Sequence, residues 1–157
     1  MTMNNKKTLG NYGENLIVDF LSSIGCSSVS LSEDQYDQHK DLTFFVDGEI
    51  HKAEVKTKTI IEKYQAFALE RNQWKKIDNC QHVYFVSIPR FPYDVIAIYE
   101  VSDKNAFFIV DNFAGKNEQT RMYPLDKLSR IKTIRDPKKC RELYDLSFSN
   151  YKGFNYV

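Results

Sequence analysis

The sequence has few cysteines, no long apolar run and no apolar leader. Its three cysteines, Cys26, Cys80 and Cys140, are widely spaced and form no CxxC motif. This argues against a disulfide framework or a structural zinc site, and it favours a reducing cytoplasm. No apolar run approaches the roughly 20 residues that a membrane helix needs, and the basic, polar start MTMNNKK does not resemble a signal peptide. We therefore expect a cytoplasmic protein that does not enter a membrane.

An excess of charge of one sign is also absent. The 157 residues carry a formal net charge of +1, and 42% are hydrophobic, 27% charged and 14% aromatic, which is typical of a folded globular protein. Repeats, low-complexity tracts and Gly/Ser-rich linkers are missing, so we expect one domain over residues 1–157. Near-neutrality excludes a histone-like coat of positive charge, but it leaves local charged surfaces open.

Charge is in fact segregated along the chain. Residues 33–49 include six acidic residues and one lysine, whereas residues 52–76 include seven basic residues against three acidic ones. Residues 127–141 again include seven basic residues against one aspartate. Such runs are often only solvated faces. The alternative is that the two basic segments converge on one phosphate-binding surface, with a carboxylate cluster between them.

Residues 8–24 are predicted to form an amphipathic helix. Thr8 is a plausible N-cap and Gly25 a plausible C-terminal stop. Gly13 falls near the centre of the apolar stripe, where its missing side chain would let the helix approach a sheet closely. The stripe at helical spacing consists of Leu9, Tyr12, Leu16, Ile17, Phe20, Leu21 and Ile24.

The rest of the chain alternates between strand and helix patterns. Residues 26–40 read as a strand fragment and loop, and residues 61–77 as a second helix. Strands rich in β-branched and aromatic residues are predicted at 82–88, 94–101 and 106–111. The last third is expected to hold a basic helix or loop and an aromatic tail. The order α-β-β-α-β-β indicates an α/β (α+β) fold with a central mixed sheet flanked by helices.

Asp47-Gly48 lies between two β-rich runs and predicts a two-residue hairpin turn. The register that follows brings Asp41 opposite Glu54, with side chains roughly 5 Å apart. Two carboxylates at that distance repel each other unless a cation lies between them. Because side chains alternate along a strand, one face should carry Lys52, Glu54, Lys56 and Lys58. The other predicted pairs are Val46 with Glu49, Phe45 with Ile50, Phe44 with His51, Thr43 with Lys52 and Leu42 with Ala53.

A cluster of Asp41, Glu54 and Lys56 suits a divalent cation and a phosphate. Mg²⁺ prefers carboxylate oxygens and takes one or two of them together with substrate phosphate and water. A metal held by Asp41 and Glu54 could neutralise charge on a phosphodiester and help deprotonate an attacking water. The Lys56 ammonium could orient that water or stabilise the developing charge. The structural alternative is a solvated hairpin face with incidental salt bridges.

This pattern resembles the PD-(D/E)XK nuclease superfamily, which includes restriction endonucleases and Holliday-junction resolvases. Asp41 is followed after twelve residues by Glu54-Val55-Lys56, and a glutamate, Glu14, precedes them in the first predicted helix. The resemblance covers residues 8–87 and implies a restriction-endonuclease-like core. It also implies that Asp41 and Glu54 bind Mg²⁺, for which Mn²⁺ can substitute. Lys56 would then assist the water nucleophile, and Glu14 would complete the metal site or remain an exposed residue of the helix.

The sequence departs from the family at one position and leaves other contacts open. The proline that precedes the aspartate in the family is missing, because His39-Lys40 stands there. Asp37 or His39 could contact the metal ligands without binding the metal directly. The family often uses polar residues that follow the ExK strand, for which the candidates are Gln65, Asn72 and Gln73. Nucleic-acid contacts are expected from Lys52, Lys58, Gln73, Lys75 and Lys76, although Lys58 could equally be merely solvent-exposed.

The sequence thus predicts a Mg²⁺-dependent endonuclease that hydrolyses DNA, with a homodimer as the assembly if both strands of a duplex are cut. A Holliday-junction resolvase or an RNA-cleaving relative is the alternative within the enzyme class. A non-catalytic module that binds nucleic acid or a protein on a nuclease-like fold is the alternative outside it. No organic cofactor is expected, because the chain has no nucleophile elbow, phosphate-binding glycine loop or Rossmann fingerprint. No histidine is expected to bind a metal, since none stands at ligand spacing.

Overall fold

The computed structural model describes residues 3–33, 40–90 and 95–148. Its elements in chain order are α1 (Met3–Ser23), β1 (Ser27–Glu33), β2 (Lys40–Val46), β3 (Glu49–Thr59), β4 (Ala66–Glu70), the 3-10 turn η1 (Arg71–Gln73), α2 (Trp74–Asp78), β5 (His82–Ile88), β6 (Val95–Glu100), β7 (Phe108–Asp111), η2 (Phe113–Gly115), β8 (Gln119–Pro124), η3 (Leu125–Lys127), β9 (Ser129–Arg135) and α3 (Pro137–Phe148). None of the described helices is long and apolar enough to cross a membrane.

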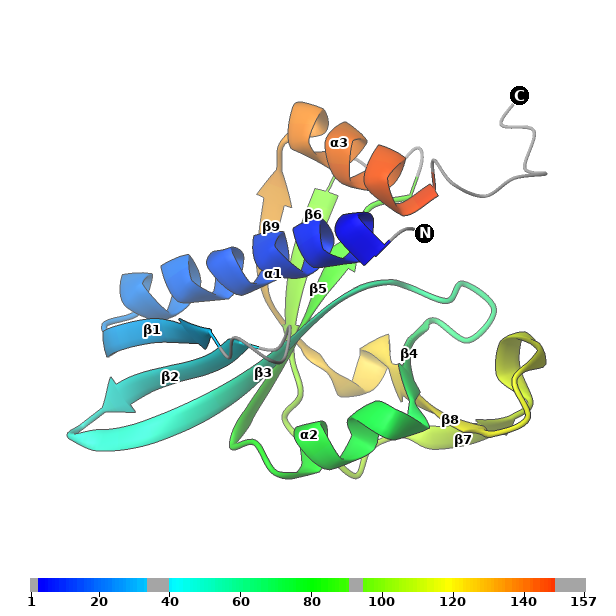
Figure 1. Cartoon of the computed structure of the whole chain (residues 1–157), viewed down its shortest axis with the longest axis horizontal. Helices are drawn as coiled ribbons and strands as arrows, with labels where there is room; N and C mark the ends of the chain where they lie inside the picture. Colours follow the sequence, from blue (N-terminus) through cyan, green and yellow to red (C-terminus); the bar gives the residue numbers. More distant parts are fainter. Residues whose placement is uncertain (1–2, 34–39, 91–94, 149–157) are drawn as a thin grey trace.

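The strands form two sheets (Figure 1). The larger has six strands in the order β1-β2-β3-β5-β6-β9, and the smaller has the order β4-β8-β7. In the larger sheet, β3 and β5 are parallel and all other neighbours are antiparallel. The chain crosses from β3 to β5 through β4 and α2. The predicted mixed sheet with flanking helices is therefore confirmed at the level of an α+β fold.

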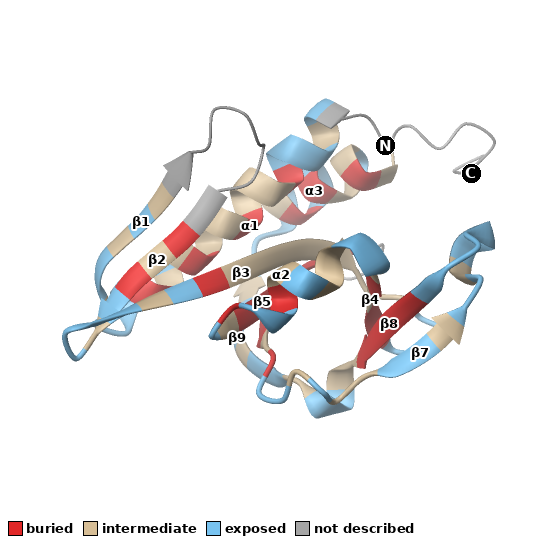
Figure 2. Ribbon diagram, turned by 60° about the horizontal axis from the view of Figure 1, so that its bottom comes forward, coloured by how far each residue is buried: buried red, intermediate tan, exposed pale blue. Residues whose placement is uncertain are grey.

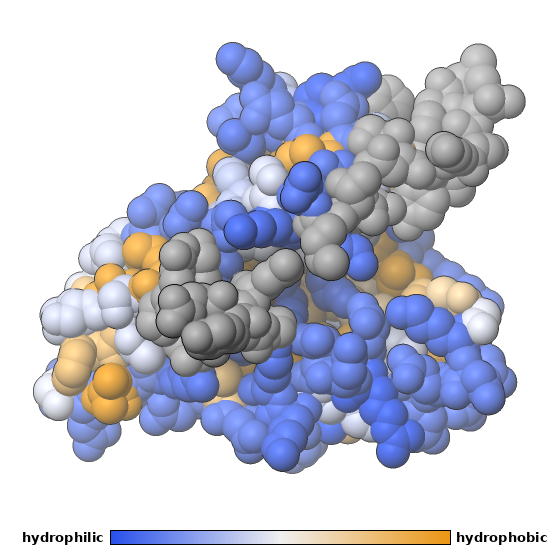
Figure 3. All heavy atoms as spheres, viewed as in Figure 1, coloured by the Kyte–Doolittle hydropathy of each residue, from blue (hydrophilic) through white to orange (hydrophobic). Residues whose placement is uncertain are grey.

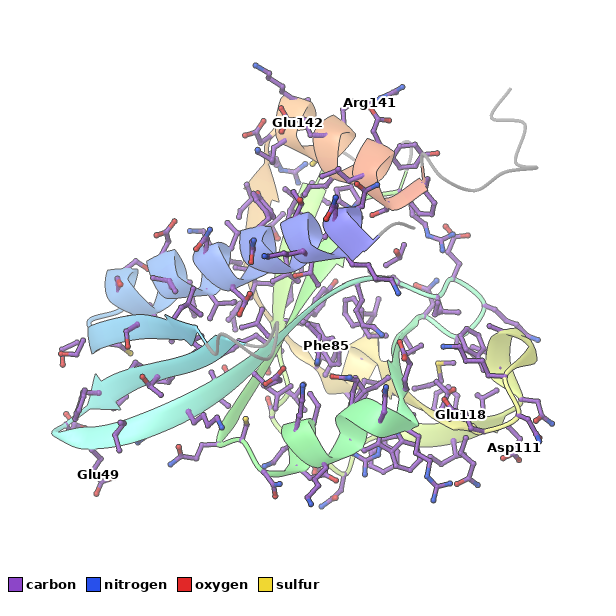
Figure 4. The ribbon with its side chains drawn as sticks, viewed as in Figure 1. Glu49, Phe85, Asp111, Glu118, Arg141 and Glu142 are labelled. Atoms are coloured by element: carbon purple, nitrogen blue, oxygen red, sulfur yellow. The ribbon has the colours of Figure 1, made fainter. Side chains whose placement is uncertain are left out.

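Two apolar cores lie on opposite faces of the larger sheet. One is formed with α1 and α3 and contains Ile17, Phe44 and Leu143. The other is formed with α2 and the smaller sheet and contains Phe67 and Phe85, whose rings stack with centroids 4.7 Å apart. Strand β5 contributes to both cores, and it is buried from Val83 onward, as a near-continuous apolar strand should be. Figure 4 accordingly shows Phe85 at the centre of the molecule.

Helix α1 matches the predicted apolar stripe but not its predicted ends. It begins at Met3, and the Thr8 hydroxyl donates to the Asn4 carbonyl at 2.9 Å, so Thr8 lies inside the helix and the N-cap prediction is wrong. The predicted stop is confirmed, because Gly25 adopts a φ of +93°, a conformation that glycine tolerates best. Ile24 is wrongly assigned to the stripe: it follows the last helical residue and is 59% exposed.

The predicted hairpin is confirmed in all five pairs from Leu42 with Ala53 to Val46 with Glu49. Asp47 and Gly48 both have positive φ, 50° and 81°, as a type I′ turn requires. Figure 4 shows Glu49 at the far tip of this hairpin. The apolar side chains visible in Figure 3 gather chiefly at the same end of the molecule, where Phe45 and Ile50 are exposed.

The predicted helix over residues 61–77 is wrong except at its C-terminal end. Residues Ala66–Glu70 form strand β4, and only Trp74–Asp78 form a short helix. The spacing of Tyr64, Phe67, Ala68 and Trp74 fits a helix locally, but β4 pairs with β8, more than fifty residues later. That partner strand supplies the backbone hydrogen bonds and buries Phe67 and Leu69 completely.

The last third contains more structure than expected. The basic helix is confirmed as α3, but β8 and β9 are polar enough that the sequence does not reveal them. Figure 2 shows the mostly buried β8 beside its neighbour β7, which is mostly exposed. The two basic segments do not lie on neighbouring strands, because β5 and β6 separate β9 from β3, and their convergence on one surface stays a prediction. The expected aromatic tail over residues 149–157 lies outside the described residues.

Candidate active site

The centre of the candidate site is a sheltered ion pair on β3. The Glu54 carboxylate lies 3.2 Å from the Lys56 ammonium, and their side chains are only 18% and 15% exposed. Lys56 also donates to the side-chain oxygen of Gln73 at 2.5 Å. The ammonium is thus fixed by two partners from different elements. At this degree of shelter, charges interact more strongly than on an open surface, because less water screens them.

Strand alternation explains why these groups meet. Ala53 and Val55 pack into the core beneath α1, and Thr57 contacts α1 as well. The intervening residues Glu54 and Lys56 therefore project from the opposite face, toward η1 and α2. This confirms the prediction that the two lie on one face of the strand.

Glu14 lies where α1 crosses β3. A Cβ built on the preceding Gly13 would lie only 1.8 Å from the Thr57 hydroxyl, so helix and strand are in direct contact there. This confirms the predicted role of Gly13 as a point of close approach. Glu14 itself is partly buried, and it is therefore not the fully solvated helix residue of the alternative interpretation.

Asp41 lies near the start of β2. Its backbone belongs to β2 and pairs with Ser32 on β1, while its side chain lies outside the described residues. The described pairing of β2 with β3 ends at Leu42 with Ala53, so the contact of Asp41 with Glu54 stays a prediction. The two outer candidates, Asp37 and His39, also lie outside the described residues.

The described side chains do not by themselves complete a metal centre. Among them, no group of three or more His, Cys, Asp or Glu residues could hold an ion. The predicted donors are the carboxylates of Glu54, Asp41 and Glu14, but Glu14 belongs to α1, which packs on the face of β3 opposite to Glu54. Carboxylate oxygens suit Mg²⁺ or Mn²⁺ better than softer metals, so the residues fit a hard divalent cation.

Of the three polar candidates after the ExK strand, Gln73 is the one whose described contacts reach the ion pair. Gln65 is exposed and donates to the Glu62 carbonyl within a turn, and Asn72 is exposed in η1. The candidate nucleic-acid contacts also differ in their exposure. Lys52 and Lys75 are exposed, whereas Lys76 and Lys58 are partly buried.

A buried arginine that the sequence does not single out holds α2 in place. Arg121 on β8 donates to both carboxylate oxygens of Asp78, at 2.8 and 3.0 Å, and this hydrogen bonding lowers the pKa of Asp78. Its guanidinium lies between the rings of Trp74 and Phe107, 4.5 and 4.4 Å from their centroids. Since Trp74 directly follows Gln73, the arginine supports the segment that fixes Lys56. No local pattern connects Asp78 with a residue 43 positions later.

The structure also joins two histidines that the sequence leaves apart. His51 Nδ1 and His82 Nε2 lie 2.8 Å apart, with stacked rings. Burial and the neighbouring His51 lower the pKa of His82, which favours its neutral form.

Comparison with known proteins finds no matching family model, no matching curated protein and no matching solved structure. The function is therefore inferred from the residues of this chain.

Proposed function

We propose that the protein is a Mg²⁺-dependent endonuclease that hydrolyses DNA phosphodiester bonds through an activated water. The observation that carries the proposal is the Glu54–Lys56 pair, which is sheltered at 3.2 Å on the face of β3 away from α1. A chain gains little stability from burying such a pair, because desolvation offsets the attraction. Retaining both charges at a partly sheltered place therefore points to a chemical role.

The arrangement of the elements supports the same proposal. A mixed sheet has α1 and α3 on one face and α2 on the other, as the resemblance to the PD-(D/E)XK superfamily implies. Strand β3 with its acidic and basic residues lies next to the parallel strand β5 inside this sheet. Glu14 at the helix crossing and Asp41 at the start of β2 are the further carboxylates available to the site.

Each residue then has a distinct role. Glu54, Asp41 and Glu14 would hold the metal, which when bound supplies charge neutralisation and a more acidic water. Lys56 stabilises negative charge as it develops on the phosphorus oxygens or orients the water. Gln73 keeps the ammonium in position through its hydrogen bond, and the exposed Lys52 and Lys75 contact the DNA backbone. If both strands of a duplex are cut, two copies of the chain act together.

The test is a cleavage panel on linear duplex, single-stranded DNA, a four-way junction and RNA, each with Mg²⁺, Mn²⁺ or EDTA. We expect metal-dependent cleavage of DNA, and a loss of roughly 100-fold or more in kcat for Glu54→Gln, as for removal of one group that stabilises a transition state. The matched control is Glu62→Gln, which changes an exposed glutamate in the turn before β4.

Two outcomes would contradict the proposal. Full activity of purified, folded Glu54→Gln would remove the residue from the site. Binding of DNA without cleavage under every metal condition would instead favour the non-catalytic module. Preference for the four-way junction or for RNA, with Glu54 still required, would move the substrate to one of the related enzyme classes.

A further inference from the structure

A cavity of about 480 Å³ lies next to the candidate active site. Four of the residues that line it are basic, and one is acidic. Uncompensated positive charge in a concave place raises the local concentration of anions. The four basic residues are Lys6 on α1, Lys58 on β3, Arg90 after β5 and Lys116 before β8, and the acidic one is Glu70 at the end of β4.

Lys58 is the most unusual of these residues. It is partly buried, yet its ammonium makes no hydrogen bond or ion pair with any described residue. Its pKa is lowered to about 8, chiefly by burial; Glu70 opposes this shift, and the nearby cations Lys56, Lys116 and Lys6 contribute to it. Burying an ammonium without such partners costs free energy, and an anion in the cavity would offset that cost.

Two further polar groups at the cavity also lack partners among the described residues. The Thr57 hydroxyl oxygen and the Nε of Arg90 are buried without a hydrogen bond, and both residues line the cavity. A hydroxyl, a guanidinium and an ammonium are donors that suit the several oxygens of a phosphate. Lys116, whose side chain is 52% exposed, lies 3.8 Å from Glu70 at the same cavity.

We propose that this cavity binds a phosphate monoester group. Its two negative charges match the excess of basic residues better than the single charge of a carboxylate or a phosphodiester does. The wall of the site is formed by Lys58, Thr57 and Arg90, with Lys6 and Lys116 as further cations.

The position of the cavity identifies one source of such a group. Lys58 follows Lys56 by two residues on the same face of β3, a separation of roughly 7 Å. A phosphate at the end of a nucleic-acid strand could therefore lie in the cavity while the chain continues past Lys56. This source rests on the proposed nuclease function, whereas a small phosphorylated molecule would not require it.

The experiment measures binding without metal, so its result does not depend on cleavage. Inorganic phosphate and glycerol 3-phosphate are titrated into the protein in EDTA at pH 7, followed by calorimetry and ³¹P NMR. We expect saturable binding that weakens about tenfold or more in Lys58→Met, since a charged hydrogen bond of ordinary strength is lost. The control is Lys132→Met, an exposed lysine on β9 at the opposite part of the sheet.

A second variant changes the affinity in the other direction. Glu70→Gln removes the one carboxylate that lines the cavity, and phosphate should bind roughly threefold more tightly. Circular dichroism and thermal melting of each variant establish that it is folded. Absence of phosphate binding to the wild type, or unchanged affinity in folded Lys58→Met, would overturn the proposal.

Oligonucleotides separate the two sources. Duplexes of one sequence carrying a 5′-phosphate, a 3′-phosphate or no terminal phosphate are compared for affinity in wild type and Lys58→Met. A preference for one phosphorylated end that disappears in Lys58→Met supports the cavity as a strand-end site. Binding of glycerol 3-phosphate without any end preference supports a small phosphorylated ligand in the same cavity.

Discussion

The two faces of β3 differ sharply although they alternate residue by residue. The face toward α1 carries Ala53 and Val55 and touches the helix backbone at Gly13. The other face carries Glu54, Lys56 and Lys58, three charged side chains that are all substantially sheltered. The first face is filled by small and apolar groups, whereas the second borders η1 and α2; the cavity lies at the end of the strand, where Thr57, Lys58 and Thr59 all line it. A strand can thus combine a tightly packed side with a charged one, because neighbouring side chains point in opposite directions.

Among substitutions that test the difference between the two faces of β3, the largest expected effect is on turnover. Lys56→Met should lower kcat roughly 100-fold while the affinity for DNA changes only a few-fold, because its contact matters most in the transition state. Single-turnover cleavage and a binding titration measure the two quantities separately. The matched change on the opposite face, Val55→Ala, should leave kcat per folded molecule unchanged. Equal loss of kcat in both variants would mean that the two faces do not differ in function.

A substitution at the contact between α1 and β3 should change the stability of the protein. In Gly13→Ala, the new methyl group would overlap the Thr57 hydroxyl, and we expect the free energy of unfolding to fall by roughly 2–3 kcal/mol. This outweighs the gain of up to about 1 kcal/mol that alanine normally brings to a helix. Urea denaturation measures the change. The double variant Gly13→Ala/Thr57→Ala should recover most of the loss, and failure to do so would place the strain elsewhere.

The support behind the active face can be tested through Arg121. Arg121→Met removes the bidentate contact with Asp78 and should lower the free energy of unfolding by roughly 2 kcal/mol. The pKa of Asp78 is lowered in the folded state, so its contribution is present above its unfolded pKa and is lost as the pH falls through the folded value. The advantage of the wild type over Arg121→Met should therefore shrink below about pH 4, while the contacts of Arg121 with Trp74 and Phe107 persist. A difference in stability that stays constant with pH would contradict this account.

The smallest expected effect is that of Lys58→Met, which should raise the free energy of unfolding rather than lower it. Burial lowers its pKa from 10.5 to about 8, so the charged form is disfavoured in the folded protein, and the unfolded chain binds the proton more tightly. At pH 7, Lys58→Met should be more stable than the wild type by roughly 1–2 kcal/mol. The advantage should shrink as the pH rises from about 8 toward 10.5, and millimolar phosphate should reduce it at pH 7. Thermal melting across pH 7–10 measures the difference.

The local parts of the fold were predictable because short-range rules determine them. Asp47-Gly48 specifies a turn in which both residues take positive φ, and the whole register of β2 and β3 follows from it. The end of α1 at Gly25 and the close approach at Gly13 are of the same kind. The alternation that places Glu54 and Lys56 on one face follows directly from the strand.

The errors at Thr8 and Ile24 concern only the ends of α1, whereas the larger errors involve partners that are distant in sequence. Residues 66–70 form a strand because they pair with β8, and nothing within the segment itself indicates this pairing. The same holds for the Arg121–Asp78 pair, for the two facing histidines and for the hydrogen bond from Lys56 to Gln73. Sequence patterns suggested Gln73 only as one of three polar candidates, and the short helix at Trp74 selects it.

The sequence by itself determined the hairpin, its register and the charged face of β3, because turn conformation and strand alternation depend on neighbouring residues only. The tertiary structure decided which groups that face meets. The crossover through β4 and α2 brings Gln73 to Lys56, and the packing of α1, β4 and the segment before β8 around Lys58 forms the cavity. These contacts join residues from separate elements, and their formation depends on the burial of two cores rather than on any local pattern.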